Sequence, residues 1–355
     1  MKKFIYILSL LTLFGLAACV TGIQDMQIAS IEMTIEDEDG NRVEELLPDR
    51  VYSLDFRVRD SAGELHTNPN YRDFRVENLD HLEVIQQARF SIKLRTGAST
   101  FHPPNSDLYS FSLAVKGNSY PGNRYTFPLD WDGFNELDYS GKDGKEGEDG
   151  DSGLSASGEA ADDVEGSDGE NGTDGTRGYP GEDVTLVLSR YQYDGEQKLL
   201  MYAPEQGQLY LADLQTIVVD ASGGDGGRGG RGGNGGSGNT FDNGTDPVVD
   251  GAAGDPGDGG DGGDAGYGGN VTLLAAESRL FNYIEPNVDG GEGGYGGAGG
   301  RAYVDGDLAK VGQEGRDGRD GRDGKLRYNS ITPTELREEL RRMNVPGFEM
   351  ENILY

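Results

Sequence analysis

Glycine recurs at every third residue in six separate runs, and this period limits the possible folds more than any other feature. A three-residue period matches the left-handed polyproline-II helix, which has three residues per turn and no internal hydrogen bonds. One face of such a helix carries no side chain, so a second backbone can approach it closely. The sequence therefore predicts rods that pack side by side. The runs span 141–153, 166–181, 223–238, 251–269, 290–300 and 312–324, and together with the segments between them they hold 50 of the 59 glycines.

Collagen is one structure with this period, but it needs an unbroken Gly-x-y repeat and abundant proline. The runs here are short, and proline occurs inside them only at Pro180 and Pro256. A collagen-like trimer is therefore an alternative interpretation. Disorder is a second one, because a chain rich in glycine and aspartate buries little apolar surface.

The favoured interpretation is a bundle of polyglycine-II-type helices within one chain. Rods of about 40–55 Å would be reversed by the linkers 155–165 and 241–249, so that neighbours lie antiparallel. Gly-Gly-x runs such as 223–238 would lie between other rods, and Gly-x-y runs such as 312–324 would lie at edges. In this respect the region resembles the glycine-rich bundles of some phage adhesin tips and of glycine-rich antifreeze proteins. That resemblance covers the repeat region only.

Apolar segments between the runs argue against disorder of the whole region. They have the length and residue types of short strands, and we expect them to form one sheet that caps or flanks the bundle. These segments are 183–188, 199–202, 209–211, 216–219, 271–274 and 279–284.

The region before the runs has ordinary composition and alternating apolar residues. Short strands at about ten-residue spacing, separated by turn residues, are typical of an immunoglobulin-like β-sandwich. No cysteine pair is present to make it a true immunoglobulin domain. The expected strands are 28–36, 51–59, 74–84, 88–94, 108–115 and 125–131.

The first nineteen residues predict how the protein is anchored. Lys2 and Lys3 precede the apolar stretch 4–16, which is short for a membrane span. The stretch runs into Leu16-Ala17-Ala18-Cys19, which resembles the lipobox of bacterial lipoproteins. The resemblance implies cleavage before Cys19, acylation of that residue and, with Val20 following it, sorting to the outer membrane. Several acyl chains would anchor the protein stably.

The net charge of -32 indicates which partners to expect. Phosphates would be repelled, which argues against nucleic acid. We therefore expect the membrane, through the lipid on Cys19, together with a protein or glycan partner or an outer-membrane protein complex. No cofactor is expected.

No catalytic or metal site is predicted from the motifs. The three histidines, His66, His81 and His102, show no recognised ligand spacing. The aspartates of the fourth run have the oxygen chemistry that calcium prefers, but a solvated acidic face is the favoured interpretation and calcium stays an alternative. These aspartates are Asp255, Asp258, Asp261 and Asp264.

The last run repeats Arg-Asp-Gly, as in Arg316-Asp317-Gly318. Its opposite charges are expected to pair along the rod or with a neighbour and to set the register. Beyond it, Thr332-Pro333-Thr334-Glu335 predicts a capped helix that buries Leu336, Leu340 and Met343 on one face and ends at Asn344 and Pro346.

The predicted fold is therefore mainly β: an N-terminal immunoglobulin-like β-sandwich, a polyglycine-II-type helix bundle with flanking β-strands, and a short C-terminal α-helix. The predicted function is a non-catalytic lipoprotein of the outer membrane that serves as a surface structural or adhesive module. An accessory subunit of an outer-membrane transport or assembly complex is the alternative, and a carbohydrate-active enzyme is a third option. The expected segments are 1–18 signal peptide, 19–27 lipidated linker, 28–138 sandwich, 139–328 bundle with inserted strands, and 329–355 helix and tail.

Overall fold

The computed structural model shows a mainly β protein with open sheets and a few short helices. Among the described residues no helix has the length and apolar character that crossing a bilayer requires. Cys19, His81 and His102 lie outside the described residues, so the structure says nothing of them. The described residues are 23–67, 70–80, 82–88, 91–97, 99–101, 109–157, 165–241, 249–304, 307–343, 345 and 347–354.

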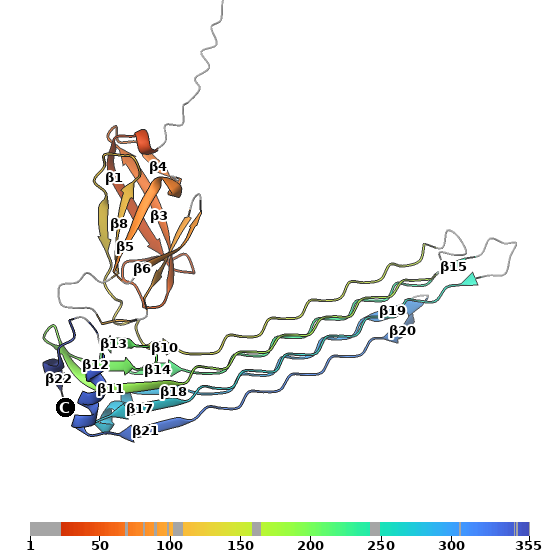
Figure 1. Cartoon of the computed structure of the whole chain (residues 1–355). Coiled ribbons are helices and arrows are strands. Elements are labelled where there is room, and N and C mark those ends of the chain that lie inside the picture. The colour runs from red at the N-terminus through yellow and green to blue at the C-terminus, as the bar shows by residue number, and fades with distance from the viewer. Residues whose placement is uncertain are drawn as a thin grey trace, which may run out of the picture. The chain divides into compact units, whose positions relative to one another are not determined.

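The chain divides into two compact units (Figure 1). The first comprises described residues of 1–98 and 105–130, and the second comprises those of 99–104 and 131–355. The boundary predicted at residue 138 therefore differs from the observed division. The strand β10 (Glu136–Asp138) belongs to the second unit because it pairs with β14 (Ile217–Asp220).

The first unit holds two sheets joined by an aromatic core. The ring of Phe56 stacks on Phe74 of the other sheet at 5.3 Å and meets Tyr71 edge-on at 5.4 Å. One sheet has the order β2-β1-β3-β7-β6, with β4 on β3, and the other has the order β5-β8-β9. The elements of the first unit are η1 (Ile23–Asp25), β1 (Ile28–Glu36), β2 (Arg42–Val43), β3 (Val51–Asp60), β4 (Leu65–Thr67), η2 (Tyr71–Asp73), β5 (Phe74–Asp80), β6 (Leu82–Ala88), β7 (Ser91–Thr96), β8 (Ser110–Val115) and β9 (Asn123–Thr126).

The segment 74–84, expected as one strand, is two strands in different sheets. β5 pairs with β8, whereas β6 pairs with β7. The chain changes sheets near residue 81, and alternation of apolar residues carries no sign of such a crossing. The strand expected at 125–131 ends instead at Thr126.

The second unit also contains two main sheets, where the sequence predicted one. The smaller is a parallel sheet of β10, β14 and β18 (Ile284–Asn287). The larger has the order β13-β12-β11-β17-β21, with β22 on β11. Its strands are β11 (Val184–Tyr193), β12 (Glu196–Ala203), β13 (Gln208–Ala212), β17 (Val271–Ala275), β21 (Leu326–Ser330) and β22 (Ile353–Leu354). Residues 279–283, expected in a strand, lie in the 3-10 helix η3 (Ser278–Tyr283).

Six extended glycine-rich segments continue from these parallel strands, as Figure 1 shows. We number them run 1 to run 6 in chain order, with the bounds given above. Runs 1, 3 and 5 follow β10, β14 and β18, whereas runs 2, 4 and 6 lead into β11, β17 and β21. The three parallel strands of each sheet therefore pass into a layer of three parallel runs. The two hairpin arms β15 (Thr240–Phe241) and β16 (Val249–Asp250) lie between runs 3 and 4, and β19 (Arg301–Val304) and β20 (Asp307–Val311) lie between runs 5 and 6.

Backbone hydrogen bonds connect the runs both within a layer and between the layers. Within a layer, neighbours are parallel and bond at every third residue, as in Gly144 N to Asp225 O and Gly147 N to Arg228 O, both 2.7 Å. Between layers, neighbours are antiparallel, as in Gly230 N to Thr173 O at 2.8 Å. Runs 3 and 4, which are rich in Gly-Gly-x, each bond to four other runs.

In one triplet of run 4, residues 259–261, all three backbone N–H groups donate to an acceptor on another run. Gly259 N donates to Gln313 O at 2.8 Å, and Gly260 N donates to Gly230 O at 2.9 Å. The third donor, Asp261 N, is bonded by the carboxylate Oδ1 of Asp174 at 2.7 Å. Because a buried backbone N–H without a partner costs free energy, this pairing between runs favours the packed arrangement.

The aspartates of the runs are therefore hydrogen-bond acceptors for the neighbouring backbone, which corrects the expectation of a merely solvated acidic face. Three of them accept N–H groups of run 6 at 2.7–2.9 Å: Asp258 from Gln313, Asp261 from Arg316 and Asp264 from Arg319. In run 6 itself, Asp317, Asp320 and Asp323 accept N–H groups of run 5.

The arginines of run 6 do not form the expected ion pairs. Among the described residues, Arg316, Arg319 and Arg322 have no carboxylate within 4.0 Å. Backbone N–H groups that donate to aspartate carboxylates and to backbone carbonyls, rather than ion pairs, connect this run to its neighbours.

We expect the triple replacement of Asp258, Asp261 and Asp264 by Ala to destabilise the second unit by about 2–3 kcal/mol, since each bond contributes about 1 kcal/mol. Replacement of all three by Asn should retain most of the stability, because an amide oxygen accepts the same bond. Urea unfolding of the two triple variants measures this difference. Equal loss in both would show that the charge, and not the acceptor, is what matters.

The C-terminal helix α1 (Pro333–Arg341) closes one side of the larger sheet. Thr332 Oγ1 accepts from Glu335 N at 3.2 Å while Glu335 Oε2 accepts from Thr332 N at 2.7 Å, which confirms the predicted capping box. Leu336 and Leu340 are buried in a cluster with residues of β11, β12 and β13, and Met343 packs against it. Asn344 and Pro346 lie outside the described residues.

The ion pair of Arg190 and Glu277 joins β11 to the segment before η3, with Nη2 and Oε1 2.7 Å apart. Burial works against the charged carboxylate, but hydrogen bonds from Arg190 and Arg279 outweigh it and lower the pKa of Glu277. A carboxyl group with a lowered pKa in the folded state adds stability above its ordinary value of 4.5, and that stability is lost as pH falls through the lowered pKa.

Glu277→Gln should therefore cost about 1 kcal/mol of unfolding free energy at pH 7, and the difference from wild type should shrink below pH 4.5. Urea titrations at a series of pH values measure this. The exposed Glu338→Gln is the matched control, for which we expect no such pH-dependent difference. A constant difference for Glu277→Gln down to pH 2 would contradict the assignment.

Candidate functional site

The strongest candidate site is a groove of about 1160 Å³ where runs 1 and 2 leave the sheets. Its lining includes the side chains of Lys142, Lys145, Arg177 and Tyr179, together with carboxylates of Asp143 and Glu182. Sequence reasoning did not predict this site. The only signal was the presence of lysine and tyrosine at outward positions of otherwise acidic triplets.

Backbone hydrogen bonds fix the frame from which these side chains project. Tyr179 N donates to Lys142 O and Thr176 N donates to Lys145 O, each at 2.8 Å. Thr176 Oγ1 also accepts from Lys145 N at 2.6 Å. Glycine at every third residue occupies the inward positions, so the side chains between them point outward. The groove is therefore built on a rigid backbone ladder rather than on a loop.

The aromatic part of the groove is exposed to solvent. Tyr179 is 63% exposed, whereas tyrosine is on average intermediate in burial. Beside it, the guanidinium carbon of Arg177 lies 5.3 Å from the ring centre of Tyr267 on run 4, which is a cation–π distance. The stacked arginine is held near the groove without using its charge in an ion pair.

The cations of the groove have no acidic partner. Among the described residues, neither Lys142, Lys145 nor Arg177 has a carboxylate within 4.0 Å. The nearby carboxylate of Asp143 accepts the N–H of Asp225 at 2.8 Å. In a chain of net charge -32, three uncompensated cations beside an exposed ring are a distinct local feature.

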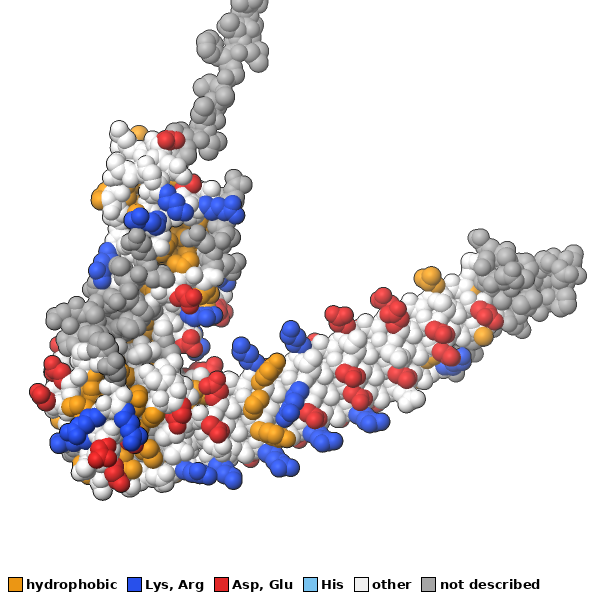
Figure 2. Space-filling view, in the orientation of Figure 1, with side chains coloured by type: hydrophobic (Ala, Val, Ile, Leu, Met, Phe, Trp, Pro, Cys, Tyr) orange, Lys and Arg blue, Asp and Glu red, His pale blue; other side chains and the backbone are white. Residues whose placement is uncertain are grey.

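Figure 2 shows that the charged side chains are unevenly distributed on the face of the bundle that it draws. Hydrophobic and basic side chains gather on the part of the bundle nearer the sheets, whereas acidic side chains dominate toward the far end. A smaller groove of about 480 Å³, lined by Glu146, Asp149, Arg228 and Arg231, has no aromatic residue in its lining.

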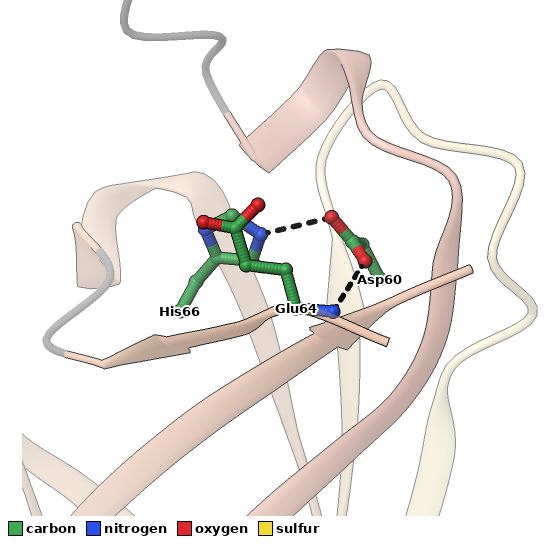
Figure 3. Close-up of side chains that lie close together, drawn as sticks. All are labelled: Asp60, Glu64 and His66. Atoms are coloured by element: carbon green, nitrogen blue, oxygen red, sulfur yellow. Dashed lines mark hydrogen bonds and ion pairs between the residues drawn. The ribbon is translucent and has the colours of Figure 1, made fainter. Parts of the chain in front are cut away.

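A second cluster, in the first unit, brings together Asp60, Glu64 and His66 (Figure 3). Their ligand atoms lie within 4.8 Å of one another, and imidazole and carboxylate are metal-ligating groups. The spacing Asp-x3-Glu-x-His was present in the sequence, but only the turn between β3 and β4 brings the three side chains together.

The Asp60 carboxylate already has a structural role in that turn. Its Oδ1 accepts the N–H groups of Ala62 at 3.0 Å and Glu64 at 2.9 Å, and Oδ2 lies 3.1 Å from His66 Nε2. The hydrogen bond from His66 and the two backbone bonds lower the pKa of Asp60. These hydrogen bonds explain the cluster, because they stabilise the turn between β3 and β4, and we assign no metal to it.

Comparison with protein-family models, with curated proteins and with solved structures finds no match to this chain. The groove between runs 1 and 2 and the sequence therefore carry the functional proposal.

Proposed function

We propose that the chain is a non-catalytic lipoprotein of the outer membrane, anchored through Cys19, that serves as a surface structural or adhesive module. In this proposal the first unit is an immunoglobulin-like β-sandwich nearest the anchor. The six runs form a polyglycine-II-type bundle that presents its outward side chains to a partner.

The observation that carries the proposal is that, within each triplet of the runs, glycine packs against neighbouring runs while the other positions bear the side chains. Glycines occupy the inward positions, where a Cβ atom would collide with the neighbouring backbone. At Gly227, for example, an added Cβ would lie 1.9 Å from the carbonyl oxygen of Lys145. Only outward residues can carry chemistry, and these form an open groove rather than an enclosed cavity. Such a surface is suited to binding a large partner and not to excluding water from a reaction.

The fold also supports a single-chain bundle over a collagen-like trimer. Each run finds its hydrogen-bond partners among the other runs of the same chain, so no second chain is needed to satisfy the glycine backbone. The apolar strands between the runs form sheets with a buried core, and this supports an ordered region.

The alternative, an accessory subunit of an outer-membrane complex, would use the long apolar segments and the tail helix as its docking surface. In the structure, Leu336 and Leu340 of that helix are 1% exposed and face the chain's own sheet. This apolar face is already covered, so we favour the adhesive module.

Two measurements on cells test the proposal. Incorporation of labelled palmitate should occur in the wild-type chain and be absent from Cys19→Ala. Protease added to intact cells should remove the runs or the linkers from the wild-type protein. A protein that takes up no lipid, or one that stays intact until the outer membrane is broken, would contradict it.

A further inference from the structure

The groove between runs 1 and 2 combines three features that point to one class of ligand. It has the uncompensated cations Lys142, Lys145 and Arg177, the exposed ring of Tyr179, and hydrogen-bonding groups in Thr176 and Glu182. Each feature alone is common on protein surfaces. Together they line one groove of about 1160 Å³ on a rigid backbone.

The cations favour a ligand with negative charge, because among the described residues none of the three has a carboxylate within 4.0 Å. The ring of Tyr179 offers a flat apolar face with a hydroxyl at its rim. Carboxylate, hydroxyl and backbone groups around it can accept and donate bonds to a ligand rich in hydroxyl groups. A saccharide with carboxylate groups has all three properties.

A nucleic acid fits this surface less well, although bases also stack on tyrosine. Every nucleotide carries a phosphate, and the acidic residues around the groove would repel such a dense line of charge. The carboxylates of Asp143 and Glu182 lie within the lining itself. A polyuronate carries one charge per sugar as well, but its hydroxyl groups can donate to these carboxylates, whereas the sugars within a DNA strand have no free hydroxyl groups.

We propose that this groove binds an acidic polysaccharide, with Tyr179 stacking on a sugar ring and Lys142, Lys145 and Arg177 pairing with its carboxylates. The inference rests on the proposed function as a surface binding module and names its ligand class. The backbones of these residues belong to the hydrogen-bond ladder of the runs but their side chains do not, so the side chains can be replaced without removing backbone contacts.

The test is binding of the full chain in detergent to fluorescent alginate oligosaccharides, with neutral pullulan and single-stranded poly(dT) as comparison probes. We expect alginate to bind in preference to both, and more weakly at high salt. The double variant K142Q/K145Q and the single variant Tyr179→Ala should each weaken alginate binding about tenfold or more.

The double variant R228Q/R231Q is the matched control, because it removes the same charge from the smaller groove of the same bundle. It should change alginate affinity less than about twofold, and unchanged thermal transitions of all variants would show intact folding. Absence of alginate binding, equal binding of pullulan, tighter binding of poly(dT), or equal loss in R228Q/R231Q would each overturn the inference.

These outcomes are separable from those that test the proposed function. A chain that is lipidated and exposed on cells but does not bind alginate would overturn the ligand class alone. A chain that binds alginate in solution but is neither lipidated nor exposed would overturn the proposed location and leave the groove assignment standing.

Discussion

Replacement of Gly230 by Ala is expected to destabilise the second unit by about 3–5 kcal/mol. A Cβ at this position would lie 1.9 Å from the carbonyl oxygen of Glu148. Real Cβ atoms do not approach so closely, and the obstructing atom is backbone in a hydrogen-bonded ladder, so it cannot rotate away. Urea unfolding followed by the fluorescence of Trp131, the only tryptophan, measures the loss.

The neighbouring variant Arg231→Ala is the control for this prediction. Arg231 is exposed, and its backbone N–H keeps its bond to Asp149 Oδ1 whatever side chain it carries. We expect a change within about 0.5 kcal/mol. Comparable effects of the two variants would contradict close packing of run 3 between its neighbours.

Replacement of Leu340 by Ala is expected to cost about 2–4 kcal/mol. Leu340 is 1% exposed and belongs to the cluster that joins α1 to the larger sheet. Truncation removes apolar contacts and leaves a cavity that a sheet on one side and a helix on the other cannot easily close. Denaturant unfolding of the second unit measures this, with the same tryptophan as probe.

Glu338→Ala on the exposed face of the same helix is its control, since it changes the helix sequence without changing the core. We expect it to shift stability by less than about 0.5 kcal/mol. If Leu340→Ala were equally mild, the helix would not be docked as the structure shows. The apolar face of α1 would then be available to a partner.

Local signals in the sequence predicted several elements well. The alternation of 28–36 and 51–59 corresponds to β1 and β3, and the capping box at Thr332 begins α1 as expected. These elements are specified by residues a few positions apart, which a sequence shows directly.

Features that depend on distant residues were predicted poorly. The strand at 136–138 belongs to the second unit only because it pairs with residues 218–220, about 80 positions later. The apolar segments divide into two sheets, because those that precede runs 3 and 5 join the smaller sheet and those that follow runs 2 and 4 join the larger one. Neither relation leaves a local pattern.

The hydrogen-bonding roles of the charged residues could not be predicted, for the same reason. Asp261 looks like one member of an acidic row, but its role depends on the N–H of Arg316 lying 2.8 Å away in another run. Likewise, Lys142 and Tyr179 come from separate runs, and only their antiparallel pairing brings both side chains to one groove.

The central claim is that the glycine-rich runs form a hydrogen-bonded bundle within one chain, and amide hydrogen exchange on glycine-labelled protein tests it most directly. We predict that amides such as those of Gly260 and Gly263 in run 4 exchange orders of magnitude more slowly than that of the exposed turn glycine Gly117, in a particle with the mass of one chain. Uniformly fast exchange of the run glycines would indicate disorder, and protection found only in a particle of three chains would indicate a collagen-like trimer. Either result would contradict the account.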